Sequence, residues 1–256
     1  MTSCLRLLTL DATGTLLRPR GRIGATYVAH WRRVASPSAV TSLLSSPERL
    51  AAAEHAIDTA FPVAFRSHSR RFPCFGKAQL SSTTAQPWWH GVIIDALPSD
   101  FVNALSETQQ RDLTTELYAF YAHSSAWRVF DDALLTLREL HARGVRMAVI
   151  SDFDERLPRL LEELLLAPFF DVVTTSWDHG AAKPSASIFR QTFHALEPRA
   201  DPSDYLHVGD HAARDYHGAH DVGAHARLLL RADGQPPVDV TPTHVVSSLQ
   251  EILPLF

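Results

Sequence analysis

The chain has 256 residues, of which 45% are hydrophobic and 20% are charged, so it can bury a sizeable core in one large domain or in a core with a smaller module. The formal net charge of −4 gives no basic field, and we expect no nucleic-acid partner. The two cysteines, Cys4 and Cys74, are too few for a disulfide framework. No apolar stretch is long enough to cross a bilayer, and no basic segment precedes a long apolar one at the N-terminus. The sequence therefore predicts a soluble cytoplasmic protein with no membrane partner.

A short apolar run near the N-terminus ends in an acid. In residues 5–17, LRLLTLDATGTLL, the apolar residues stop at Asp11, and Thr13, Gly14 and Thr15 follow. A buried strand accounts for the apolar run, and the glycine permits a sharp turn after it. Asp11 is therefore either a solvated turn residue or a functional carboxylate at the carboxyl end of a strand.

The next hundred residues have a different character. Residues 47–65 and 99–124 show helical patterns, and an irregular section at 67–89 lies between them. No convincing strand is present in residues 18–126, and Pro62 and the serine and threonine cluster at 81–84 predict breaks. We expect a helical insertion, with Trp88 and Trp89 in its own core rather than stacked on a substrate.

In the second half of the chain, predicted strands alternate with predicted helices. Strands are predicted at 145–151, 169–177, 204–210, 225–231 and 243–249. Helices are predicted at 131–144, 155–166, 185–196 (capped by Ser185), 213–223 (ended by Gly223) and 247–256. This alternation is typical of βαβ units, and it predicts an α/β fold with a parallel sheet covered on both faces.

Three predicted strands end in a polar residue: Asp11, Ser151 and Asp210. The carboxyl ends of parallel strands meet at one edge of the sheet, where such folds bind their ligands. The same arrangement suits phosphoryl transfer, which needs a nucleophile, a cation and fixed hydrogen-bond donors. Asp11 can act as the nucleophile, and the Ser151 hydroxyl can hold a phosphoryl oxygen.

The sequence also offers candidate ligands for the cation and a candidate basic partner for the nucleophile. Asp210 and Asp215, five residues apart in GDHAARD, can both point at one Mg²⁺ ion. Lys183, a single basic residue in AAKPSAS, can pair with the nucleophile and with the phosphoryl group. The 14 histidines raise the alternative of a zinc site, because His217 and His220 lie three apart on a predicted helix. Neither HExxH nor paired CxxC is present, so we favour solvated or core-edge histidines.

Four segments, in order, resemble the four motifs of the haloacid dehalogenase (HAD) superfamily. They are LDATGTL, VIS, AAKPSASIF and VGDHAARD, and the following GAHDVGA resembles the usual continuation. The resemblance implies a Rossmann-like core formed by residues 1–17 and 127–256. It also implies a smaller, mostly helical cap at residues 18–126.

The resemblance also assigns roles in a phosphohydrolase. It implies that Asp11 is both the nucleophile and a magnesium ligand, and that Thr13 gives its backbone carbonyl to the metal. Ser151 and Lys183 would hold the phosphoryl group, and Asp210 and Asp215 would complete the metal site. The implied substrate is a small phosphorylated metabolite, and no particular oligomeric state is implied.

Two residues depart from the usual family pattern. Most family phosphatases have an aspartate two residues after the nucleophile as general acid and base, whereas this chain has Thr13, whose hydroxyl does not titrate near neutral pH. The P-type ATPases have a similar Asp-x-Thr-Gly-Thr motif and hydrolyse their aspartyl-phosphate slowly. Asp152 follows Ser151 where many relatives have asparagine, and its charge would repel a phosphate dianion unless it is protonated or points away.

The sequence therefore leaves three functions open. The first is a Mg²⁺-dependent phosphohydrolase that acts through an aspartyl-phosphate at Asp11 and is slow because of Thr13. The second is a non-catalytic HAD-like protein that binds a metabolite or a protein. The third, a haloacid dehalogenase, fits less well, because the Asp210 and Asp215 carboxylates would repel a carboxylate substrate in the absence of a metal.

Overall fold

The computed structural model describes residues 5–231 and 237–256, and the chain divides into two compact units. The first unit comprises the residues up to Arg18 and those from Arg128 onward, and the second comprises Pro19–Trp127. Cys4 lies outside the described residues, so the prediction about the cysteines stays a prediction. Among the helices of the described residues, none is both long enough and apolar enough to span a membrane.

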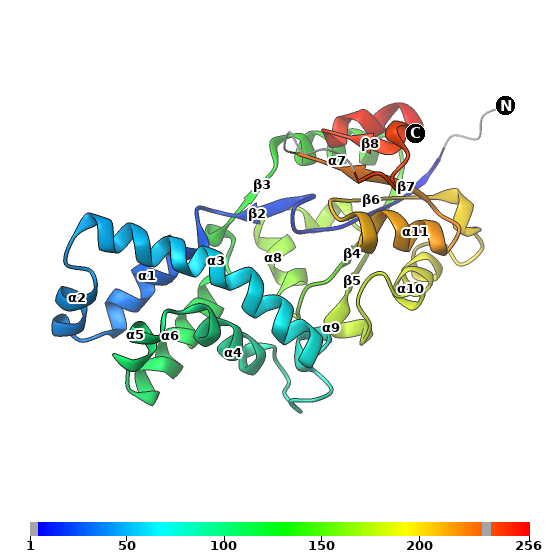
Figure 1. The fold of residues 1–256 in the computed structure, drawn as a ribbon. Coiled ribbons are helices and arrows are strands. Elements are labelled where there is room, and N and C mark those ends of the chain that lie inside the picture. The colour runs from blue at the N-terminus through cyan, green and yellow to red at the C-terminus, as the bar shows by residue number, and fades with distance from the viewer. Residues whose placement is uncertain (1–4, 232–236) are drawn as a thin grey trace. The chain divides into compact units, whose positions relative to one another are not determined.

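The first unit is built on a six-stranded parallel sheet with the strand order β5-β4-β1-β6-β7-β8 (Figure 1). The predicted α/β class with a parallel sheet is thereby confirmed. The strands are β1 (Leu7–Leu10), β4 (Arg146–Ser151), β5 (Val172–Thr175), β6 (Tyr205–Gly209), β7 (His225–Leu229) and β8 (Val245–Val246). The α-helices of this unit are α7 (Asp131–Ala142), α8 (Leu157–Glu163), α9 (Ser176–His179), α10 (Ala186–Leu196) and α11 (Gly218–Asp221).

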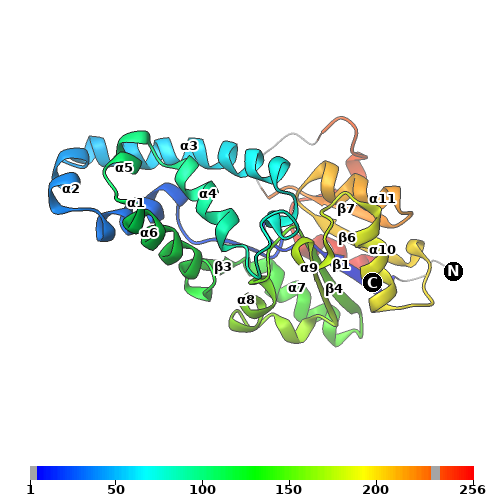
Figure 2. The same ribbon diagram turned by 90° about the horizontal axis from the view of Figure 1, so that it is seen from below.

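Helices cover both faces of this sheet, as the alternating pattern predicts (Figure 2). One face packs against α10 and α11, where a core cluster includes Leu7, Ile150, Phe189 and Tyr205. On the other side, α7 lies against the 3₁₀ helix Leu249–Leu255 (Figure 1). Side chains alternate between the faces along each strand, so residues two apart share a face.

The second unit is mostly helical. Its helices are α1 (Ile23–Val34), α2 (Pro37–Leu43), α3 (Pro47–Arg71), α4 (Gln86–Ala96), α5 (Ser99–Asn103) and α6 (Glu107–Phe120). Trp88 is 1% exposed and packs edge-to-face on Phe65 and Phe75, and it therefore lies in the core of this unit, as expected. Its neighbour Trp89 is half-buried and stacks on Phe61.

Several predicted details are wrong in the helical regions. Pro62 lies inside α3 and does not break it, whereas residues 81–84 do form an irregular segment before α4. Two short strands that the sequence did not indicate, β2 (Leu17–Pro19) and β3 (Trp127–Val129), form a two-stranded sheet. Strands of three residues are too short to show a period-2 pattern, which is why the sequence conceals them.

Several predicted elements of the first unit differ from the structure. The strand predicted at 243–249 is only β8 (Val245–Val246), and the helix predicted at 247–256 is a 3₁₀ helix over Leu249–Leu255. The strand predicted at 169–177 is confined to β5, because a 3₁₀ turn precedes it and α9 begins at Ser176. Ser185 precedes α10, but its hydroxyl contacts the Ser187 hydroxyl at 3.0 Å and makes no capping hydrogen bond. The helix predicted at 213–223 is a π-helix over Ala212–His217 followed by α11, and Gly223 after it has φ +90°.

Candidate active site

Strand register brings the polar strand ends to one edge of the sheet. Leu10 of β1 pairs with Val149 of β4 on one side and with Val208 of β6 on the other. Asp11 follows Leu10 directly, and its backbone N–H donates to the carbonyl of Val208 at 2.9 Å. Asp210 follows the end of β6 in the same way, so the two carboxylates emerge from adjacent strands.

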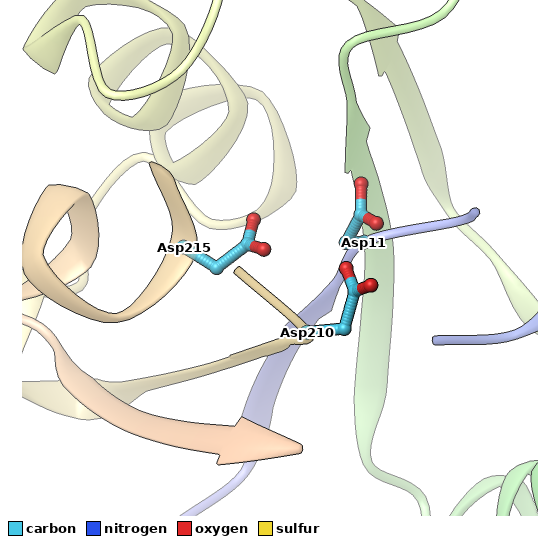
Figure 3. Close-up of side chains that lie close together, drawn as sticks. All are labelled: Asp11, Asp210 and Asp215. Carbon is cyan, nitrogen blue, oxygen red and sulfur yellow. The ribbon is translucent and has the colours of Figure 1, made fainter. Parts of the chain in front are cut away.

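Three carboxylates converge at this edge (Figure 3). One oxygen from each of Asp11, Asp210 and Asp215 lies within 4.8 Å of the other two, and among the described residues no other cluster of acid, histidine or cysteine side chains is close enough to hold a metal ion. Asp215 comes from the π-helix after β6 and turns back toward the strand ends (Figure 3). The cluster therefore joins residues that are separated by about two hundred positions in the sequence.

Lys183 links two of these carboxylates. Its Nζ atom donates to Asp11 Oδ1 at 2.7 Å, to Asp215 Oδ1 at 2.6 Å and to the Ile150 carbonyl at 2.9 Å. These three acceptors match the three donors of an ammonium group, and the residue is only 5% exposed. Lys183 thus holds the two acids close together and offsets part of their mutual repulsion.

The surrounding charges and burial shift the pKa values of these groups. Burial would lower the pKa of Lys183, but the carboxylates of Asp11 and Asp215 outweigh it and raise that pKa, so the ammonium form persists at neutral pH. Burial raises the pKa of Asp11 despite the opposing effect of Lys183. Burial acts in the same direction on Asp215, but Lys183 and His207 outweigh it and lower the pKa of that carboxyl.

Asp210 has a carboxyl that, like that of Asp11, is hard to keep charged without a cation. Desolvation by neighbouring atoms comes first, followed by the negative charges of Asp11 and Asp215, and together they raise its pKa to about 7. Its side chain still reaches solvent. A cation bound between the three carboxylates would offset the repulsion that contributes to this shift.

The turn after Asp11 depends on Gly14. This residue has φ +89°, and a Cβ atom here would overlap the carboxylate of Asp210. The Gly14 N–H donates to the Leu17 carbonyl at 2.8 Å, which closes the turn. Thr13, the residue that replaces the usual aspartate, lies in this turn and is solvent-exposed.

Arg231 ties the same turn to distant parts of its unit. Its guanidinium donates to the carbonyls of Gly14 at 3.2 Å and Thr15 at 2.7 Å and to Asp132 at 2.8 Å. It also lies over the Phe130 ring, 3.8 Å from the ring centroid.

Asp132 in turn accepts hydrogen bonds from the hydroxyl of Ser248 and the backbone N–H of Leu249, which start the last 3₁₀ helix. We refer to Arg231, Asp132 and Phe130 as the Arg231 clamp.

Ser151 and Asp152 lie at the end of β4. Ser151 is 2% exposed. Oδ1 of Asp152 accepts the backbone N–H of Lys183 at 2.9 Å, and Oδ2 lies 3.7 Å from the Arg214 guanidinium. Burial raises the pKa of Asp152. Asp152 therefore anchors the loop that carries Lys183, and both of its oxygens face positive or donor groups.

Sequence reasoning missed two residues next to the acids, Thr9 and His207. His207 Nε2 lies 3.3 Å from Asp215 Oδ1, and His207 Nδ1 lies 2.9 Å from the Thr9 hydroxyl. Burial lowers the pKa of this imidazole. The signal in the sequence is a polar residue inside an otherwise apolar strand, as in LLTL and YLHVG.

The zinc alternative has no support among the described residues. His217 Nε2 pairs with Asp239 at 2.8 Å, and the ring of His220 packs against Tyr216 and His244. These histidines do not form a cluster of three or more metal-binding side chains.

Comparisons with known proteins agree on one family. A family model described as haloacid dehalogenase-like hydrolase matches residues 5–223. The chain belongs to the haloacid dehalogenase-like hydrolases. It is 33% identical over 254 residues to human haloacid dehalogenase-like hydrolase domain-containing protein 3, covering 98% of this chain and 93% of that protein.

Solved structures share the HAD fold at lower identity. The match to the structure of a dehalogenase covers 100% of this chain and 99% of the dehalogenase chain, with a TM-score of 0.68 and 20% sequence identity. The HAD hydrolase YfnB from Bacillus subtilis, solved with bound magnesium, covers 97% of this chain and 96% of its own, with a TM-score of 0.64 and 17% identity. The resemblance noted in the four motifs is thereby confirmed, and hydrolysis is the reaction class of the family.

Proposed function

We propose that this HAD-like hydrolase is a Mg²⁺-dependent phosphohydrolase that acts on a small phosphorylated metabolite. The observation that carries the proposal is the cluster of Asp11, Asp210 and Asp215, with Lys183 bonded to two of its members. A carboxylate cluster attracts a cation, and a buried ammonium beside it attracts the phosphoryl oxygens. Magnesium bound to YfnB supports the same assignment by analogy.

The donor set fits Mg²⁺. Carboxylate oxygens are the hard ligands that Mg²⁺ prefers, and the ion usually keeps several waters beside its protein ligands. Oδ1 of Asp11 and Oδ1 of Asp215 are bonded to Lys183, so the second oxygen of each carboxylate is the one directed to a ligand. When bound, the ion would neutralise the phosphoryl oxygens.

The chain's own residues account for the remaining chemistry. A carboxylate oxygen of Asp11 attacks phosphorus, the bond to the leaving oxygen breaks, and an aspartyl-phosphate forms. Lys183 and the Ser151 hydroxyl hold phosphoryl oxygens during this transfer. Water then attacks phosphorus, which restores the Asp11 carboxylate and releases phosphate. The backbone carbonyl of Thr13 completes the proposed metal ligands.

Thr13 limits the rate of both steps. The leaving oxygen needs a proton, and the attacking water must lose one, but a threonine hydroxyl does neither near neutral pH. The leaving group must therefore depart as an anion or take its proton from solvent. We propose that the helical unit, Pro19–Trp127, acts as the cap that selects the substrate, as the family resemblance implies.

A screen of phosphate esters tests the proposal. Purified protein is assayed with Mg²⁺, with a chelator, and as the Asp11→Asn variant. Asp112→Asn, an exposed acid on α6, serves as the matched control. We expect turnover that needs both Mg²⁺ and Asp11 and that survives Asp112→Asn. Full Mg²⁺-dependent turnover by Asp11→Asn would show that the assignment is wrong.

A non-catalytic binding role is the second candidate, and Thr13 is the observation that favours it. Turnover of any ester above the Asp11→Asn level counts against pure binding. Dehalogenation is tested in the same preparation, since halide release that persists in a chelator would favour that reaction instead.

A further inference from the structure

We propose that His207 is a positioning residue which, together with Thr9, fixes the Asp215 carboxylate so that one of its oxygens faces the metal site. The inference rests on the proposed Mg²⁺ site and adds two residues outside the four motifs to it. It is carried by the hydrogen bonds that connect β1, β6 and the π-helix.

His207 is a polar side chain enclosed by the core. It is 1% exposed on β6, and the edge of its ring meets Phe189 at a centroid distance of 5.1 Å. Thr9, which is 0% exposed, is its direct partner across the β1–β6 pairing. A buried imidazole is costly unless both ring nitrogens are bonded, and here each nitrogen has one partner.

The chemistry of the partners sets the direction of these bonds. An ionised carboxylate only accepts hydrogen bonds, so His207 Nε2 must carry the proton that it shares with Asp215. In the neutral ring, Nδ1 then accepts a hydrogen bond from the Thr9 hydroxyl. The chain of donors thus runs in one direction, from Thr9 through His207 to Asp215.

The hydrogen bonds that Asp215 accepts determine which of its oxygens is left for an outside partner. Oδ1 receives Lys183 Nζ at 2.6 Å and His207 Nε2 at 3.3 Å, which fill its two lone-pair positions. Oδ2 receives only the backbone N–H of His211 at 2.9 Å, which leaves one position for an outside partner. This count covers the part of the chain that the structure describes.

The backbone of β6 also restricts where the Asp215 carboxylate lies. A Cβ atom at Gly209 would overlap the Asp215 carboxylate, so the acid lies directly against the backbone of β6. Gly209 and His207 are two residues apart and share that face of the strand. Without His207, Lys183 would be the single donor on Oδ1 and His211 N–H the single donor on Oδ2, so two hydrogen bonds instead of three would fix the orientation of the carboxylate.

Magnesium affinity of the substrate-free protein tests the proposal, and calorimetry with MgCl₂ is the measurement. His207→Phe keeps the bulk and removes both bonds, and we expect it to weaken Mg²⁺ binding about 10- to 100-fold, the range that follows loss of a partner of a metal ligand. His207→Gln retains a donor and an acceptor and should stay within about threefold of wild type.

Tyr205→Phe is the matched control. It removes a buried hydroxyl from the same strand face, where the hydroxyl bonds to the carbonyls of Phe193 and Glu197, far from the acids. We expect destabilisation with unchanged Mg²⁺ affinity. Unchanged affinity in His207→Phe, or an equal loss in Tyr205→Phe, would overturn the proposal.

A second measurement separates this inference from the proposed function. In metal-free wild-type protein, ¹⁵N NMR should show His207 as the Nε2–H tautomer, assigned by its loss in His207→Gln. Thr9→Val should shift the Nδ1 resonance of that ring. The opposite tautomer, or a charged ring at pH 7.5, would refute the positioning role. A wild-type protein that binds no Mg²⁺ but shows the expected tautomer would refute the metal site and leave the hydrogen-bond chain intact.

Discussion

Magnesium affinity should depend steeply on pH, because a proton competes with the ion for Asp210. Desolvation, and then the charges of Asp11 and Asp215, raise the pKa of Asp210 from 3.8 to about 7. The ion must displace that proton, so the apparent Kd scales as one plus the ratio of proton concentration to the acid constant. Between pH 8 and pH 6 this factor rises from about 1.1 to about 11, a loss of about tenfold in affinity. The raised pKa of Asp11 acts in the same direction.

Calorimetry at pH 6, 7 and 8 in two buffers of different ionisation enthalpy measures both the affinity and the protons released. We expect release of about half a proton from Asp210 at pH 7. An apparent Kd that is constant within about twofold from pH 6 to pH 8 would refute this reasoning.

The raised pKa of Asp210 also makes the stability of the metal-free protein depend on pH. The folded protein binds the proton of Asp210 more tightly than the unfolded chain does, so in the metal-free protein this carboxyl opposes folding increasingly as pH rises from about 4 to about 7. Asp210→Asn should therefore melt at a higher temperature than wild type at pH 8 without metal, while its Mg²⁺ affinity falls. A lower melting temperature for the variant at pH 8 would contradict the assigned sign.

Three other substitutions follow from the site. Thr13→Asp restores an acid and base and should raise turnover by about 10²- to 10⁴-fold, most for esters with poor leaving groups, and an unchanged dependence on leaving group would contradict this. Gly14→Ala should lower the free energy of unfolding by about 1–3 kcal/mol and weaken Mg²⁺ binding, because its Cβ overlaps Asp210. Gly144→Ala, at φ +74° with nothing within 4 Å of the added Cβ, should cost stability alone, as urea titration would show. Arg231→Met should lower the free energy of unfolding by about 2–3 kcal/mol through loss of three hydrogen bonds, and a change below about 0.5 kcal/mol in urea titration would contradict the clamp.

The sheet could be predicted because its strands are buried on both faces. Runs such as RMAVIS and YLHVG are mostly apolar, and each is bounded by turn residues. The short strands β2 and β3 and the uninterrupted helix through Pro62 could not be predicted in this way. Tertiary contacts, rather than local pattern, decide those elements.

For the candidate site, the sequence indicated the residues that end strands but not the residues that hold them. Asp11, Asp210 and Lys183 stand out because each is polar next to an apolar or glycine-containing segment. Thr9 and His207 are polar residues inside apolar strands, but the sequence does not show that they pair with each other, 198 positions apart. The partners of Arg231 in the turn after Asp11 are likewise distant, 216 and 217 positions away.

The Arg231 clamp connects the last part of the chain to the turn after Asp11. The family model matches residues 5–223, and Arg231 and the Ser248–Leu249 turn lie beyond that span. Yet Arg231 holds the turn that follows Asp11, and the Ser248–Leu249 turn bonds to its partner Asp132. A fragment trimmed to the matched span would keep every acid of the site and lose the contacts that support the turn after Asp11. The contacts that hold the turn after Asp11 therefore extend beyond the span that the family model matches.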